Sequence, residues 1–170
     1  AGDNEYRTSF ERYVMAELLD EILESATARL SIMSRGRYAL YRDTAAGDQR
    51  RRGGLDIVVH DDHTGKLRPA STLSGGEGFL ASLALALGTS DVVQARSGGV
   101  RIDALYIDEG FGSLDSETLD QAMRVILDLQ RQSDRVVGMI SHVAEMRERI
   151  PARLEITSGR DGSRVSVRLP

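Results

Sequence analysis

Residues 102–109 read Ile-Asp-Ala-Leu-Tyr-Ile-Asp-Glu, a short apolar run that ends in two carboxylates. The run has the length of a buried strand, and the following Gly110 favours a turn. Ligands of α/β proteins bind at the carboxyl edge of the sheet, which is where Asp108 and Glu109 would stand. An aspartate there can hold Mg²⁺ and a second acid can activate water, although surface turns also supply many such pairs.

Downstream of this run, helix and strand patterns alternate. The expected elements are an amphipathic helix over 116–130, a buried strand over 135–140 ending at Ser141-His142, a short helix through Arg149 and a hairpin over 154–169 that turns around 159–162. Ser116 is the candidate N-cap of the first helix. The side chains available to face the core are Leu119, Met123, Ile126, Leu127 and Leu129. This alternation predicts an α/β fold with a mainly parallel sheet core, helices and added antiparallel hairpins.

Upstream, residues 71–77 read Ser-Thr-Leu-Ser-Gly-Gly-Glu and precede an apolar stretch from Phe79 to Leu87. The pattern predicts a deeply buried helix that Gly88 closes. The free N–H groups at the start of such a helix favour an anion, and the glycines let a phosphate approach closely. An ordinary helix capped by Ser74 explains the same residues.

The beginning of the chain predicts a long helix from Glu5 to Met33, ended by Gly36. The expected units are therefore the long helix in 1–34 and a globular part in 35–170. Apolar residues recur every fourth position of the helix, so the stripe winds around it. Contact with a partner helix at its start and simple packing against the core both fit this pattern.

Strand patterns over 38–42 and 55–60 predict a hairpin whose connection, 44–54, is polar and contains glycine. This loop carries Arg50-Arg51-Arg52, which fits either solvated surface or a contact with DNA phosphates. His60-Asp61-Asp62-His63 contains metal-ligand residue types, but strand ends and turns are rich in aspartate for local hydrogen-bonding reasons. The turn is therefore the favoured interpretation.

Composition excludes several classes of protein. The 170 residues include 41% hydrophobic and 28% charged residues, enough to bury a core. The absence of cysteine excludes disulfides, cysteine zinc sites and a thiol nucleophile. A net charge of −4 argues against binding nucleic acid through bulk positive charge. There is no apolar run of membrane-spanning length and no leader pattern, so we expect no membrane span and a cytoplasmic location.

The sequence also lacks a P-loop. That motif needs Gly-Lys followed by Ser or Thr, with a further glycine five residues before the pair. Lys66 is the only lysine; it follows Gly65, but Leu67 comes next and His60 stands five residues before Gly65. The start at Ala1 rather than Met separately suggests a processed or excised fragment.

In their order along the chain, these motifs resemble those of the ABC-type ATPases, in the SMC-like branch that includes the SbcC DNA-repair proteins. Leu73-Ser74-Gly75-Gly76-Glu77 is similar to the ABC signature. Leu105-Tyr106-Ile107-Asp108-Glu109 resembles a Walker B strand with its catalytic glutamate. Ser113-Leu114-Asp115 resembles the D-loop, and Ile140-Ser141-His142 resembles the segment with the switch histidine.

Two positions favour the SbcC form over transporters, which usually have Gln in place of Glu77 and Pro in place of Gly110. The resemblance implies the C-terminal half of an ABC-type ATPase head, preceded by the returning arm of a coiled coil. The P-loop would then come from the N-terminal head segment of the same protein. Binding of ATP and Mg²⁺ would require that segment, and this chain alone would be inactive.

The resemblance also implies a role for each motif. Asp108 would support Mg²⁺, Glu109 would polarise the attacking water and His142 would contact the γ-phosphate. The signature, Leu73-Ser74-Gly75-Gly76-Glu77, would reach ATP held by the second head of a homodimer. Ser113-Leu114-Asp115 would lie at the same interface.

The implied output is DNA end processing and double-strand break repair at the nucleoid. The implied partner is an SbcD-type nuclease docked near the base of the coil, on or beside 5–33. The head of an architectural SMC or recombination-mediator ATPase, which organises DNA, would carry the same motifs and remains the alternative. A transporter protein is disfavoured by Glu77 and Gly110.

Overall fold

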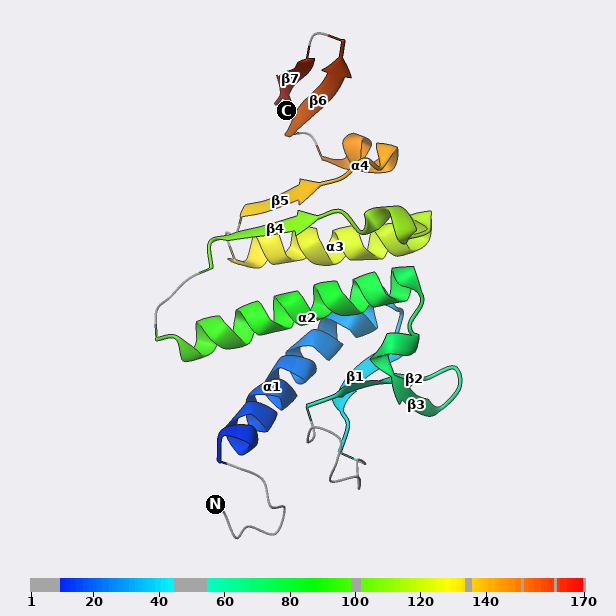
Figure 1. Ribbon diagram of the computed structural model, residues 1–170, viewed down its shortest axis with the longest axis vertical. Coiled ribbons are helices and arrows are strands. Elements are labelled where there is room, and N and C mark those ends of the chain that lie inside the picture. The colour runs from blue at the N-terminus through cyan, green and yellow to red at the C-terminus, as the bar shows by residue number, and fades with distance from the viewer. Residues whose placement is uncertain are drawn as a thin grey trace.

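A computed structural model describes residues 10–44, 55–98, 102–133, 136–150, 152–160 and 162–169. Its elements are α1 (Phe10–Met33), β1 (Tyr38–Arg42), β2 (Ile57–Asp61), β3 (Lys66–Pro69), η1 (Ala70–Thr72), α2 (Gly75–Arg96), β4 (Ala104–Asp108), η2 (Phe111–Ser113), α3 (Ser116–Ser133), β5 (Val136–Ile140), α4 (Ala144–Arg149), β6 (Arg153–Gly159) and β7 (Gly162–Arg168). In Figure 1, α2 lies between α1 and α3, and the hairpin β6–β7 lies at the end opposite the N-terminus.

The strands of the described residues form three separate sheets. β1, β2 and β3 pair in that order, all antiparallel, and β6 pairs with β7 as the predicted hairpin. β4 and β5 are the parallel pair, and α3 connects them. The α/β class is therefore confirmed, with β4–β5 as the parallel part of this chain. The sequence does not predict β3, because Lys66–Pro69 has no strand pattern and is positioned by its pairing with β2.

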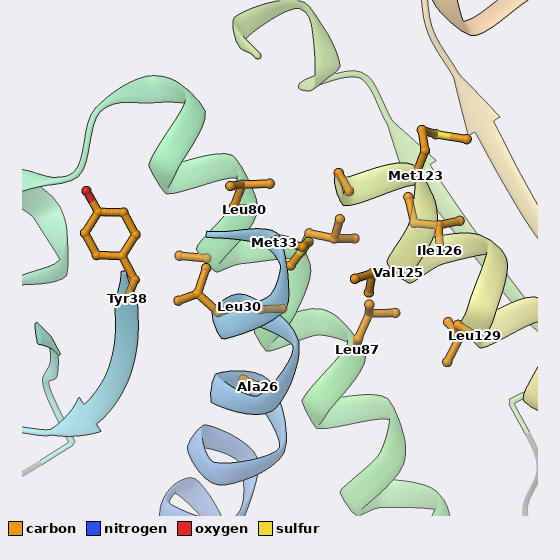
Figure 2. Close-up of a cluster of buried hydrophobic side chains, with 14 of the residues drawn as sticks. Ala26, Leu30, Met33, Tyr38, Leu80, Leu87, Met123, Val125, Ile126 and Leu129 are labelled. Carbon is orange, nitrogen blue, oxygen red and sulfur yellow. The ribbon is translucent and has the colours of Figure 1, made fainter. Parts of the chain in front are cut away.

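The core lies among the second half of α1, α2 and α3 (Figure 2). The residues that α1 buries are Leu23, Ala26, Leu30 and Met33, at a spacing of three and four. The first turns of α1 are exposed instead, with Phe10 80% and Tyr13 58% accessible. The predicted every-fourth stripe therefore faces the core only at its end, because it winds around the helix. Residues 5–9 of the predicted helix and Arg50-Arg51-Arg52 lie outside the described residues.

The end of α1 is closed as the sequence predicts. Gly36 has a left-handed backbone with φ of 81°, and its N–H donates a hydrogen bond to the Ser31 carbonyl at 2.7 Å. This bond satisfies a carbonyl that the helix itself leaves free. The chain then turns directly into β1.

Gly88 does not end α2, so that prediction is wrong. The helix continues to Arg96, and Gly88 is buried where α2 crosses α1. A Cβ at this position would lie 2.8 Å from both the Ala26 nitrogen and the Ile22 carbonyl oxygen. Glycine thus lets the two helix backbones approach closely, and no breaker follows it to stop the helix.

We expect Gly88→Ala to lower the free energy of unfolding by about 1–3 kcal/mol. Overpacking against two backbone atoms outweighs the gain in helix propensity of about 1 kcal/mol. Gly78→Ala, in the same helix, is the matched control, because nothing lies within 4 Å of a Cβ added there. Urea denaturation followed by circular dichroism measures the free energy of unfolding of both variants. A Gly88→Ala protein as stable as the unmutated protein would contradict the close crossing.

Among the described residues, α2 is the one helix that is long and apolar enough to cross a membrane by length and composition. However, 44% of its most apolar window is buried inside the protein. The exposed positions between Leu80 and Val93 are Ser82, Ala86, Thr89 and Val93 itself. The burial identifies α2 as a core helix, as predicted.

The predictions for α3 need two corrections. Leu119, Met123, Ile126 and Leu129 are buried, but Leu127 is 38% exposed because it falls off the buried stripe. The N-cap is Asp115 rather than Ser116: the Asp115 carboxylate accepts the Thr118 N–H at 2.8 Å. Ser116 is already the first helical residue.

Candidate functional site

Two exposed carboxylates and an imidazole meet at the carboxyl edge of the parallel pair. β4 ends at Asp108, which pairs with Ile140 at the end of β5. The Glu109 N–H donates to the Ile140 carbonyl at 2.9 Å, and Glu109 Oε1 lies 3.5 Å from His142 Nδ1. The fold therefore gathers Asp108, Glu109 and His142 at one edge, as the strand pattern predicts. All three remain accessible to a ligand.

The backbone at Glu109 is left-handed, with φ of 58°. This conformation costs a non-glycine residue about 1 kcal/mol or more and is held only where surrounding contacts fix it. Here the bond to Ile140 fixes it, and Gly110 continues the turn with φ of 94°. A Cβ at Gly110 would overlap the Phe79 ring. Phe79 in turn packs edge-on against the buried Phe111, at 4.9 Å between ring centroids.

The turn before α2 forms a capping box. The Ser74 hydroxyl accepts the Glu77 N–H at 3.4 Å, and Glu77 Oε2 accepts the Ser74 N–H at 2.9 Å. Leu73 packs against the core, whereas Ser74 and Gly75 are exposed. The capping explanation of Ser74 is therefore correct. It is also compatible with an anion site, because the first N–H groups of a helix have no partners within it.

The segment after β4 packs against this turn. A Cβ at Gly76 would lie 2.9 Å from the Ser113 carbonyl oxygen and 3.5 Å from the Leu114 side chain. Glycine at position 76 is therefore required for the contact. Asp115 follows as the N-cap of α3, and its hydrogen bond from the Thr118 N–H lowers the pKa of its carboxyl.

An open pocket of about 620 Å³ joins these two segments. The sequence-predicted residues that line it are Ser74, Gly75, Gly76, Glu77, Ser113, Leu114 and Asp115. Its lining does not include Asp108, Glu109 or His142. Apart from Leu73, which packs against the core, the structure thus sorts the predicted site residues into two groups: one lines the pocket, and the other lies at the strand edge. η2 connects them, since a Cβ at Gly112 would lie 3.5 Å from His142 Nε2.

Sequence reasoning missed the opposite wall of the pocket. Arg35, Arg37 and Tyr38, from the end of α1 and the start of β1, line it together with Glu117. Arg35 forms an ion pair with Glu117. No local motif marks these residues, because only the tertiary fold brings them to a turn about forty positions later.

The cluster His60-Asp61-Asp62-His63 has a structural explanation. Asp61 is 2% exposed, and its two carboxylate oxygens each accept a hydrogen bond from Arg37 at 3.1 Å. The same carboxylate accepts the His63 N–H at 3.2 Å. The hydrogen bond from Arg37, which outweighs the effect of desolvation, lowers the pKa of Asp61. Arginine and the turn backbone therefore occupy the carboxylate that a metal would need.

Comparisons with known proteins agree with the arrangement of motifs. Residues 44–128, half of the chain, match the family model described as SbcC/RAD50-like, Walker B motif. The chain is 51% identical over 162 residues to the SbcC subunit of the nuclease SbcCD of Vibrio cholerae, covering 95% of this chain and 16% of that protein. It is 49% identical over 168 residues to the protein of the same name from Staphylococcus epidermidis, covering 99% and 16%. The chain thus spans about one sixth of the length of these curated relatives.

Solved structures show the same fold. An SMC ATPase structure has a TM-score of 0.68 and 15% identity, covering 92% of this chain and 88% of that chain. The Smc head domain of Pyrococcus furiosus gives 0.66 and 15%, covering 92% and 37%. At these identities the likeness establishes the fold of an SMC head.

Proposed function

Because the chain belongs to the SbcC/RAD50-like family, we propose that it is one part of a split ATPase head that hydrolyses ATP between two heads. This proposal rests mainly on the separation of the site residues into two groups. The signature turn and the D-loop share a pocket, whereas the two acids and His142 lie outside its lining. This separation supports a site in which each group serves a different nucleotide.

Uncovered apolar surfaces support a missing complementary segment. On one face of β4–β5, Tyr106, Val136 and Ile140 are 60–75% exposed. On one face of β6–β7, the cross-strand pairs Leu154–Val167 and Ile156–Val165 are 60–72% exposed. Contiguous apolar surface of this kind marks an interface. We assign it to the N-terminal head segment of the same protein, which would also carry the P-loop.

The residues at the strand edge suit magnesium and a nucleotide. Magnesium prefers oxygen ligands, keeps several waters and uses few carboxylates, so Asp108 alone can serve as its ligand from this chain. A bound magnesium ion would neutralise charge on the phosphate oxygens. Glu109 would accept the proton of the attacking water, and its contact with His142 would orient the carboxylate. His142 would donate a hydrogen bond to the γ-phosphate.

The pocket group would act on the other head. The Ser74 hydroxyl and the N–H groups of Gly75 and Gly76 would bind phosphate oxygens of ATP held by the partner head. Asp115 would lie at the interface, where its negative charge and its capping of α3 hold the D-loop in place. Each head would then contact both nucleotides, and hydrolysis would weaken the dimer.

We further propose that 1–34 form the returning arm of a coiled coil and 35–170 the lobe of the head. The exposed apolar residues of the first turns of α1, Phe10 and Tyr13, suit a partner helix and lie beside the proposed dock of an SbcD-type nuclease. The resulting complex would process DNA ends at the nucleoid, in the cytoplasm. The names of the relatives favour this output over an architectural SMC function.

The split head has a direct test. Because the isolated chain has no P-loop, we expect calorimetry to show no binding of ATP to it at millimolar concentrations of ATP. Mixing it with the N-terminal segment should restore binding and hydrolysis. Micromolar binding of ATP by the isolated chain would contradict the proposal.

A further inference from the structure

The Glu77 side chain is engaged by its own chain. Besides the Ser74 N–H, its carboxylate accepts a hydrogen bond from the Tyr38 hydroxyl and one from Arg37 Nη1 at 3.4 Å. Arg68 Nη2 lies 3.9 Å from Glu77 Oε2. Desolvation alone would raise the pKa of Glu77, but the hydrogen bonds from Tyr38 and Ser74 and the charge of Arg37 keep it below its usual value. Glu77 is therefore a carboxylate with several internal donors.

Tyr38 is the buried centre of this network. Tyr38 is the first residue of β1 and is only 4% exposed. The Arg37 guanidinium lies 4.7 Å from the centre of its ring, and that of Arg68 lies 5.7 Å from it. Burial and the bond to Glu77 raise the pKa of Tyr38 to about 12. The Tyr38 hydroxyl donates its hydrogen bond to Glu77.

The buried Asp61 anchors both arginines to the three-stranded sheet. Arg37 binds it through two nitrogens at 3.1 Å, and Arg68 Nη2 lies 3.5 Å from its Oδ2. Two arginines are thus shared between two carboxylates, so the charges within the network balance. The turn at Ser74, which precedes α2, is therefore held by one residue from each strand of this sheet: Tyr38 of β1, Asp61 of β2 and Arg68 of β3.

We propose that Tyr38, supported by Arg37 and Arg68, is a positioning residue for the signature turn. It fixes the Glu77 carboxylate, which binds the Ser74 N–H and thereby holds Ser74 and Gly75 toward the pocket. Tyr38 would promote head association in this way, through its hydrogen bond to Glu77. This inference rests on the proposed function, in which the signature binds ATP of the partner head.

The test uses heads completed with the N-terminal segment. Tyr38→Phe removes one hydroxyl and keeps the buried ring. We expect association of two heads with a non-hydrolysable ATP analogue, measured by analytical ultracentrifugation, to weaken about tenfold, the range for a hydrogen bond to a charged group. Binding of fluorescent ATP to the head's own P-loop should be unchanged. Tyr41→Phe is the matched control, since Tyr41 lies on the same strand and is 51% exposed.

Three outcomes would decide against an assignment. Unchanged association of Tyr38→Phe heads would overturn the role of Tyr38. An equal loss of association and of ATP binding by the head itself would show a general structural effect and would also overturn it. Ser74→Arg distinguishes the underlying proposal, because heads of this variant that still associate would contradict the action of the signature on the partner's ATP.

Discussion

In a head completed by its P-loop segment, Glu109→Gln is expected to slow ATP hydrolysis by about 10²- to 10⁴-fold while two heads still associate with ATP. The amide has the size of the carboxylate but does not accept the proton of the attacking water. The backbone should be unaffected, because the Glu109 N–H rather than its side chain makes the bond to Ile140.

Single-turnover hydrolysis and size-exclusion chromatography with ATP measure the two effects separately. Glu145→Gln is the matched control, since Glu145 is exposed in the first turn of α4. Hydrolysis by Glu109→Gln heads at the unmutated rate would show that the water is activated by another group.

The second large effect concerns association. Ser74→Arg heads should bind ATP at their own P-loop but fail to dimerise. The arginine removes the hydroxyl that accepts the Glu77 N–H, a cap contribution of about 0.5–2 kcal/mol, and places a long side chain at the pocket. The partner's nucleotide would then lose the hydrogen bond from the Ser74 hydroxyl, and the arginine side chain would fill part of the pocket that the nucleotide needs.

Ser71→Arg adds the same side chain three residues earlier, at an exposed position that does not line the pocket. It should leave ATP-dependent association unchanged, as measured by light scattering. A common loss in both variants would indicate general charge repulsion instead of a specific signature contact.

The parts of the fold that could be predicted are those marked by local patterns. The apolar runs that became β4 and β5 place Asp108 and His142 at one edge, because consecutive parallel strands end on the same side. The cap at Ser74 also follows from sequence, and the structure adds the return bond from the Ser74 N–H to Glu77, three residues later. These features depend on short-range geometry.

The remaining features depend on contacts between distant segments. Gly88 indicates a helix end by propensity, but its role is the crossing with Ala26, sixty-two positions earlier along the chain. Tyr38 looks like an ordinary strand residue, and only the fold brings it to Glu77. The identity of a single residue does not reveal its distant contact, because a glycine in a helix or a tyrosine in a strand can pack against many different segments.

The tight turn between β2 and β3 has a practical consequence. Residues 62–65 are exposed and lie beyond the buried Asp61, where the chain reverses. A fluorescent label attached there, or a short epitope tag inserted there, would leave the register of the β1–β2 and β2–β3 pairings unchanged. A one-residue insertion inside β4 or β5, by contrast, would turn the later side chains of that strand to the opposite face and disturb the contact between Glu109 and His142.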